Sequence, residues 1–293
     1  MKSWSETKTG YFYATLTYLV WGLIPIYWKL LKSISPFEII VHRAFWSFLV
    51  FLALLGAQKQ IRTLFTSLKS LRSFLAICAS AGLIAINWFI FVYGVNFDRI
   101  LEVSLGYFIY PFVNILLGLV FLKEKLTARM WAAIALVAIG VGQLAIPTHG
   151  VPWIAIILAL SFGLYGFMRK TIALDILIVS NIESFLLAVP AGGYLLYLLF
   201  QQSSSQSHYS LTILLLLLFG GVITAFPLLW FAKAAKRLPL SSLGFFQYFG
   251  STLQFLLAVL VYQEPFTKTH AIGFGFIWIA LALYFSETMK KRG

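Results

Sequence analysis

Residues 104–108 read Ser-Leu-Gly-Tyr-Phe, and residues 242–246 read Ser-Leu-Gly-Phe-Phe, 138 positions later. Shared apolar composition does not explain why Ser-Leu-Gly recurs, and near-constant spacing between matches is typical of an internal duplication. We therefore predict two repeats, over residues 1–147 and 148–293. The other matches, at spacings of 139 to 144 residues, are Thr17-Tyr-Leu-Val-Trp-Gly22 with Ser161-Phe-Gly-Leu-Tyr-Gly166, Glu124-Lys-Leu-Thr127 with Glu264-Pro-Phe-Thr267, and Gly82 with Gly221.

Apolar runs occupy most of the 293 residues, of which 61% are hydrophobic and 11% charged, with a mean hydropathy of +0.91. Soluble domains carry about a quarter charged residues. Ten runs are long enough to cross about 30 Å of hydrocarbon as helices, and their uniformly apolar character does not fit the alternation of a membrane barrel. The predicted fold is an all-α integral membrane protein of ten transmembrane helices. The predicted spans are 10–31, 37–57, 73–95, 102–122, 127–146, 150–168, 178–200, 211–231, 240–262 and 267–287.

The distribution of basic residues predicts the orientation. With the N-terminus in the cytoplasm, 17 of the 22 Lys and Arg residues lie on the cytoplasmic side, as the positive-inside rule requires. Both termini are then cytoplasmic, and the net charge of +13 reflects membrane topology rather than nucleic-acid binding. Because each repeat holds five helices, the second is inverted relative to the first, an arrangement that places a site near the midplane.

Glycine and proline interrupt several predicted helices. Proline frees the carbonyl four residues earlier and bends the helix, and such breaks are tolerated at membrane depth where they line a cavity. The alternative is that both residues are simply common in membrane helices. Their recurrence favours moving helices that line a cavity. The candidate hinge residues are Gly22, Pro25, Gly106, Pro111, Pro227, Gly244 and Gly250.

Charged residues within apolar runs are the second signal. Lys29, Glu102 and Glu183 are candidate intramembrane charges, and such groups usually pair or face water. We expect Arg43 to pair with Glu102 or Glu38 in an outer vestibule. The alternative is an ordinary interfacial cluster of snorkelling side chains.

Other basic and imidazole groups have separate expected roles. Arg169 and Lys170 end the helix over 150–168 and are expected to be cytoplasmic anchors. His42 lies deep in its span, and because imidazole titrates near neutral pH it is the candidate for proton coupling.

Aromatic residues make up 17% of the chain, and several lie in the middle of predicted helices. Because buried Tyr hydroxyls require partners, we expect some to face a polar cavity that also contains amide groups. Such a cavity suits an amphipathic or aromatic solute. The alternative is that these residues form interfacial belts or pack between helices. The candidate substrate-pathway residues are Trp21, Tyr27, His42, Arg43, Asn87, Trp88, Tyr107, Tyr110, Tyr165, Gln247 and Tyr248, with Gln254 beside them.

Motifs of enzymatic chemistry do not occur in the sequence. It contains no phosphate-binding loop, no H-E-x-x-H and no G-x-S-x-G. One cysteine, Cys78, and four scattered histidines predict neither a disulfide nor a metal cluster. We therefore expect no enzymatic activity, no cofactor and no metal site.

Five stretches are distinctive enough to compare with known families: Trp21-Gly-Leu-Ile-Pro25, Glu38-Ile-Ile-Val-His-Arg-Ala-Phe-Trp-Ser47, Ser104-Leu-Gly-Tyr-Phe108, Arg237-Leu-Pro-Leu-Ser-Ser-Leu-Gly-Phe-Phe-Gln-Tyr248 and Glu264-Pro-Phe266. They resemble the RarD group of the EamA family, in the drug/metabolite transporter superfamily. The resemblance implies two EamA repeats, a plasma-membrane location and secondary transport. The sequence departs from the family pattern at Tyr110-Pro111 and Gly250-Ser251, where Asn-Pro and Ala-Pro are expected.

These observations predict a permease for a small organic metabolite or drug-like solute, working by alternating access in the lipid bilayer. Its two halves would rock around a midplane cavity lined by the first, third, fourth, sixth, eighth and ninth spans. A channel-like facilitator is the first alternative and an intramembrane enzyme the second. The sequence leaves the solute, the direction of transport, the coupling ion and the oligomeric state open.

Overall fold

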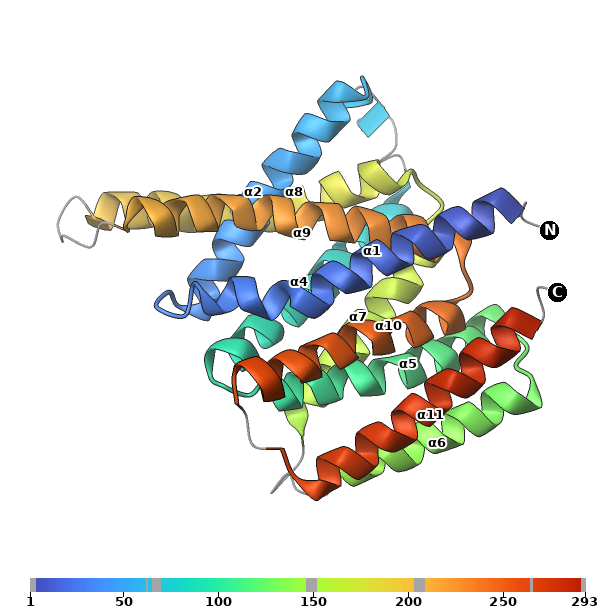
Figure 1. Ribbon diagram of the computed structural model, residues 1–293. Helices are drawn as coiled ribbons and strands as arrows, with labels where there is room; N and C mark the ends of the chain where they lie inside the picture. Colours follow the sequence, from blue (N-terminus) through green and yellow to red (C-terminus); the bar gives the residue numbers. More distant parts are fainter. Residues whose placement is uncertain are drawn as a thin grey trace.

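The computed structural model describes residues 4–61, 63–64, 70–145, 152–202, 209–263 and 266–290. These residues form a bundle of ten long helices, one of which, α10, continues into a π-helical turn, η1 (Figure 1). The helices are α1 (Trp4–Lys29), α2 (Pro36–Ala57), α4 (Leu71–Asn96), α5 (Ile100–Leu122), α6 (Ala128–Ala145), α7 (Trp153–Thr171), α8 (Ile176–Gln202), α9 (Leu211–Arg237), α10 (Leu240–Leu256), η1 (Leu257–Val261) and α11 (Lys268–Lys290).

Polar residues mark the helix starts. The side chains of Ser35, Ser70 and Ser210 accept hydrogen bonds from backbone N–H groups in the first turns of α2, α4 and α9. The carboxylate of Asp175 does the same for α8, with its Oδ1 2.8 Å from the backbone nitrogen of Leu177. These side chains satisfy donors that a helix start leaves without intrahelical partners.

The outer surface of the bundle is apolar. Seven stretches of the described residues are long and apolar enough to cross a membrane, and shorter apolar helices lie at Ala128–Gln143 and Lys268–Tyr284. Leu71 and Phe200 are 72% and 78% exposed, as is typical of side chains that face lipid. The prediction of an all-α, multi-pass membrane fold is therefore confirmed.

Several helices differ in length from the predicted spans. Helix α1 begins at Trp4 rather than at residue 10, and α9 ends at Arg237 rather than at residue 231. Hydropathy predicts only the part within hydrocarbon, whereas a helix can continue into water with polar residues. The span predicted over 240–262 ends in η1, and a π-helical turn of this kind has no hydropathy signature.

The contacts between helices show an internal symmetry. If α1, α2, α4, α5 and α6 are matched in order with α7, α8, α9, α10 and α11, each contact described below maps onto itself or onto another observed contact. Helix α2 packs against α8, α5 against α10, and α6 against α11, as Figure 1 shows for the last pair. The contact of α1 with α9 has its counterpart in that of α4 with α7, and the contact of α5 with α7 in that of α1 with α10. A duplicated five-helix unit would have this property. The predicted boundary at 147/148 and Glu264 lie outside the described residues.

Glycines allow close approach at two of these related crossings. A Cβ atom on Gly106 would lie 2.9 Å from the Cα of Ala155, where α5 crosses α7. A Cβ atom on Gly22 would lie 3.1 Å from the carbonyl oxygen of Gly250, where α1 crosses α10. Small residues let helix backbones pack closely in membranes. These candidate hinge residues therefore lie at tight helix crossings.

Candidate functional site

A cavity of about 520 Å³ lies between the two sets of five helices. Its walls come from α1, α2, α4 and α5 of the first set and from α7, α9 and α10 of the second. Each of the six spans predicted to line the cavity contributes at least one residue to its wall. Helix α2, which was not among them, contributes Arg43. The lining residues are Trp21, Ile24, Trp28, Arg43, Ile84, Asn87, Trp88, Phe91, Tyr107, Phe162, Thr224, Leu228, Gln247 and Gln254.

Arg43 is the charged residue in this wall, and its side chain is 6% exposed. Its Nε donates to Oγ1 of Thr224 on α9, over 3.2 Å. Its guanidinium carbon lies 4.4 Å from the ring centre of Trp28 and 4.7 Å from that of Trp88, so the cation is held between two indole faces. Its Nη1 has no hydrogen-bond partner among the residues that the structure describes.

The predicted pairing of Arg43 with Glu102 or Glu38 is wrong. Glu102 forms an ion pair with Arg99, three residues earlier on α5, and accepts a hydrogen bond from the backbone nitrogen of Ile154. No ion pair among the described residues joins Glu38 to Arg43. The reason is geometric: α2 turns Arg43 inward toward α9, whereas Glu102 lies in the first turn of α5, beside Arg99.

Lys29 also lies outside the cavity. Its Nζ is 2.5 Å from Oδ1 of Asp98, and the Nζ of Lys32 is 2.8 Å from Oδ2. Hydrogen bonds from Lys29 and then Lys32 lower the pKa of Asp98. Lys29 and Glu102 thus belong to two ion pairs at the same end of the bundle.

Three amide side chains in the cavity wall bridge helices or turns. The Nδ2 of Asn87 donates to the carbonyl of Leu158 and to Oγ of Ser161, which ties α4 to α7. Gln247 donates to Ser251, and Gln254 donates to the backbone of α1. The Oε1 atoms of Gln247 and Gln254 are buried, and no described residue donates a hydrogen bond to them.

Aromatic rings form the apolar part of the wall. The ring centres of Trp21 and Phe162 are 5.3 Å apart and nearly perpendicular, and those of Phe91 and Tyr107 are 5.9 Å apart. With the two indoles beside Arg43, these rings provide flat apolar faces around the few polar groups. This combination is typical of binding sites for small molecules.

Tyr27 and His42 do not line the cavity. The hydroxyl of Tyr27 donates to the carbonyl of Leu216 on α9. The Nδ1 of His42 accepts a hydrogen bond from Nε1 of Trp46, one turn later on α2, over 3.1 Å. Both side chains have partners within the helix packing, and the proton-coupling role of His42 remains a prediction.

Of the remaining predicted tyrosines, Tyr107 lines the main cavity, whereas Tyr110, Tyr165 and Tyr248 do not. Tyr110 packs on Phe162 behind the wall, with ring centres 5.0 Å apart, and Tyr248 stacks on Phe108 at 5.8 Å. Tyr165 lines a second cavity, of about 240 Å³, which shares Ile84, Trp88 and Leu228 with the first.

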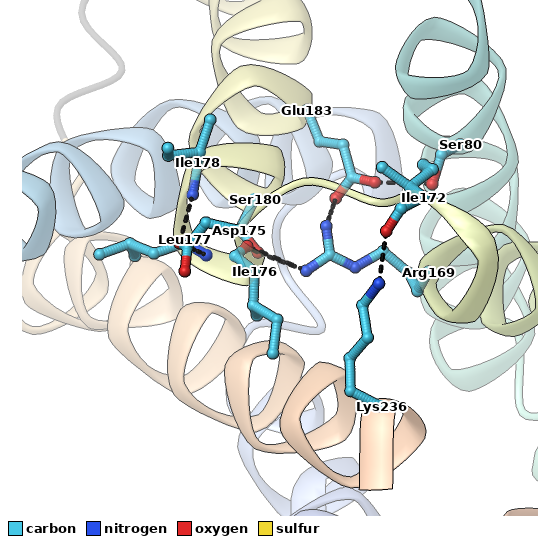
Figure 2. A network of polar contacts seen from close by, with 10 residues as sticks. All are labelled: Ser80, Arg169, Ile172, Asp175, Ile176, Leu177, Ile178, Ser180, Glu183 and Lys236. Carbon is cyan, nitrogen blue, oxygen red and sulfur yellow. Dashed lines mark hydrogen bonds and ion pairs between the residues drawn. The ribbon is translucent and has the colours of Figure 1, made fainter. Parts of the chain in front are cut away.

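Glu183 lies in the second cavity within a buried polar network (Figure 2). Its Oε2 is 3.3 Å from Nη1 of Arg169, and its Oε1 accepts a hydrogen bond from Ser80, over 2.6 Å. Arg169 also donates to Oγ of Ser180 and to the carbonyl of Ile176. The network joins α4, α7 and α8.

Arg169 is expected from the sequence to be a cytoplasmic anchor, but its side chain does not reach the surface, because the start of α8 covers the last turn of α7 and leaves Arg169 3% exposed. Lys170, the next residue, donates to the carbonyls of Ala235 and Leu238 at the end of α9. Neither contact has a signal in the sequence, since each depends on how distant helices pack.

The lining residues that sequence reasoning missed include Trp28, Phe162 and Thr224. Trp28 lies seven positions after Trp21 and so on the same face of α1, a spacing that could have identified it. Thr224 offers no such signal, because its importance rests on Arg43, 181 residues away. In the part of the chain that the structure describes, no three His, Cys, Asp or Glu side chains gather as a metal site would require.

Comparison with known proteins gives consistent matches. Residues 8–145 match the EamA-like transporter family. An uncharacterized transporter of Vibrio cholerae is 42% identical, covering 97% of this chain and 94% of the relative. The protein RarD of Escherichia coli is 39% identical, with coverage of 98% and 97%. A crystal structure with 16% identity superposes with a TM-score of 0.69 over 96% of this chain and 95% of that chain, which shows a common fold.

Proposed function

Because this chain belongs to the EamA family of transporters, together with the RarD proteins, we propose that it is a secondary transporter. It moves a small organic solute across the plasma membrane by alternating access. The observation that carries this proposal is the cavity whose wall is shared by α1, α2, α4 and α5 with α7, α9 and α10. Relative movement of the two sets would change the access to such a cavity.

Two polar contacts of α4 and its C-terminal end flank the cavity. Ser80, nine residues after its start, donates a hydrogen bond to Glu183, whereas Asp98, just past its end, pairs with Lys29. The residues of α4 that line the cavity fall between them, from Ile84 to Phe91. At 1.5 Å per residue, Ser80 and Asn96, the last residue of α4, are about 24 Å apart along the helix axis. The Ser80–Glu183 contact joins the two sets and would change as access alternates, whereas the Lys29–Asp98 contact lies within the first set.

The proposed orientation has both termini in the cytoplasm, with inverted repeats over 1–147 and 148–293. Two observations support it. The start of α1 and the end of α11 lie at the same end of the bundle (Figure 1). The predicted cytoplasmic segments hold 17 of the 22 basic residues.

An exchange assay tests the transport proposal. Proteoliposomes containing the full chain, loaded with a cell extract of small metabolites, should release specific solutes faster when the same extract is outside than when buffer is outside. This stimulation by solute on the opposite side is a property of carriers. Release at the rate of protein-free liposomes would contradict the proposal. Single-channel currents in a planar bilayer would instead favour the channel-like alternative.

A further inference from the structure

The strongest unexplained feature of the cavity is a buried cation without a counter-charge. Arg43 forms no ion pair with any described residue. The buried carboxylate of Glu183 is paired with Arg169 instead. Glu102 is bound by Arg99. Buried charges in membrane proteins are normally paired or face a water-filled space. Arg43 lines the cavity, where a mobile counter-charge could reach it.

The contacts of Arg43 hold its guanidinium in place and leave part of it available. Thr224 accepts one hydrogen bond, and the faces of Trp28 and Trp88 fix the plane of the group. Indole faces attract a cation but do not neutralise it. Within the described part of the chain, the Nη1 atom has no hydrogen-bond partner, although Arg43 is 94% buried. A planar guanidinium with free N–H groups is suited to a carboxylate.

The duplicated sequence shows how this asymmetry arises. Arg43 and Glu183 are 140 residues apart, within the range of the repeat spacing, and so occupy comparable places in α2 and α8. Glu183 has its partner in Arg169, three residues after Gly166. Three residues after the matching Gly22 stands Pro25, which carries no charge. The first half thus lacks a side chain at that place that could pair with Arg43.

We propose that the solute of this transporter is an organic monoanion, whose carboxylate binds Arg43 and whose apolar body lies against the aromatic wall. The inference rests on the proposed transport function and adds the class of solute. A single cation in the wall favours a carboxylate over a phosphate dianion, which would require further donors or positive charge.

Two hydrogen-bond acceptors in the wall favour a solute that also carries a hydrogen-bond donor. The Oε1 atoms of Gln247 and Gln254 are acceptors that no described donor reaches, and each residue is 2% exposed. They lie seven residues apart, two turns along the same face of α10. Buried acceptors left unpaired are unfavourable, so a solute hydroxyl or amino group that reaches one of them stabilises the complex.

Equilibrium binding to the purified full-length protein tests the proposal. Quenching of the fluorescence of the indoles in the wall reports binding. The probes are phenylacetate, its uncharged analogue phenylacetamide, and mandelate, which adds a hydroxyl to phenylacetate. We expect mandelate to bind most tightly and phenylacetamide to bind at least about tenfold more weakly than phenylacetate, because it lacks the charge-assisted hydrogen bonds.

Substitutions identify the residue responsible. Arg43→Gln should abolish the preference for acid over amide, and Arg43→Lys should retain part of it, since lysine keeps the charge but not the planar fork. Lys32→Gln, at an exposed lysine outside the cavity, is the matched control and should keep the full preference. Should the Arg43 variants not fold, the comparison of the two probes on the unchanged protein still decides the matter. Equal binding of acid and amide, or no saturable binding of either acid, overturns the proposal.

The two proposals can fail separately. If the acids bind but proteoliposomes show no accelerated exchange of mandelate, the anion site stands and its link to transport fails. If exchange of uncharged solutes is observed but the acids do not bind, transport stands and the anion site is overturned.

Discussion

The side-chain Nε2 of Gln254 lies 2.9 Å from the backbone carbonyl oxygen of Trp21. This carbonyl is four residues before Pro25, which has no N–H to donate to it. A side chain of α10, in the second half of the chain, therefore donates the hydrogen bond that this carbonyl of α1, in the first half, lacks within its own helix. The contact joins the two halves at the wall of the cavity.

Gln254→Leu should lower the free energy of unfolding by about 1–3 kcal/mol, because it leaves the Trp21 carbonyl buried without a donor. Thermal unfolding monitored by size-exclusion chromatography measures the change. The control is the same substitution in a Pro25→Ala background, where the restored N–H can bond to that carbonyl. There the loss should be smaller; equal losses in both backgrounds would show that the two residues are not coupled.

Breaking the Arg169–Glu183 pair should be strongly destabilising. Glu183→Leu or Arg169→Leu alone leaves an uncompensated buried charge and should reduce stability by about 3–5 kcal/mol. The double variant should lose less than the sum of the two, since it removes both charges. Additive losses would mean that the ion pair of Figure 2 does not couple the two residues.

Gly106→Ala should be destabilising by about 1–3 kcal/mol, because the new methyl group would meet backbone atoms of Ala155 that cannot turn aside. Gly82 is the matched control, since a Cβ atom there would have no atom within 4 Å. Gly82→Ala should leave the melting temperature unchanged or raise it slightly, because alanine is the better helix former. The opposite order of the two effects would contradict the close crossing of α5 and α7.

Much of this architecture could be predicted from the sequence, because hydropathy alone identifies helices that must satisfy their backbone groups within lipid. The six spans expected around the cavity all line it, and Trp21, Asn87 and Gln247 are in its wall.

Side-chain partners could not be predicted in the same way. Arg169 occupies the end of a helix, where a basic residue is usually an anchor, and only the packing of α8 shows that it is buried. Arg43 contacts Thr224 across 181 residues, and Glu102 is held by its close neighbour Arg99. These pairings depend on the rotation of each helix, which hydropathy does not report.

The Lys29–Asp98 contact predicts a small pH dependence of stability. The pKa of Asp98 is lower in the folded protein, so its contribution is present above the unfolded pKa and is lost as the pH falls through the folded pKa. Because Asp98 is largely exposed, Asp98→Asn should change stability at pH 7 by at most about 1 kcal/mol. The melting temperatures of variant and wild type should converge in acid and in high salt. A difference that grows in acid would contradict this assignment.

The most direct test of alternating access is the labelling rate of a cysteine in the cavity from each side of the membrane. Leu228 lines both cavities, so Leu228→Cys in a Cys78→Ser background provides a single reporter thiol. A membrane-impermeant thiol reagent applied to either face alone should label it, because the cavity opens to each side during the cycle. Labelling from one face only, under all solute conditions, would contradict the account.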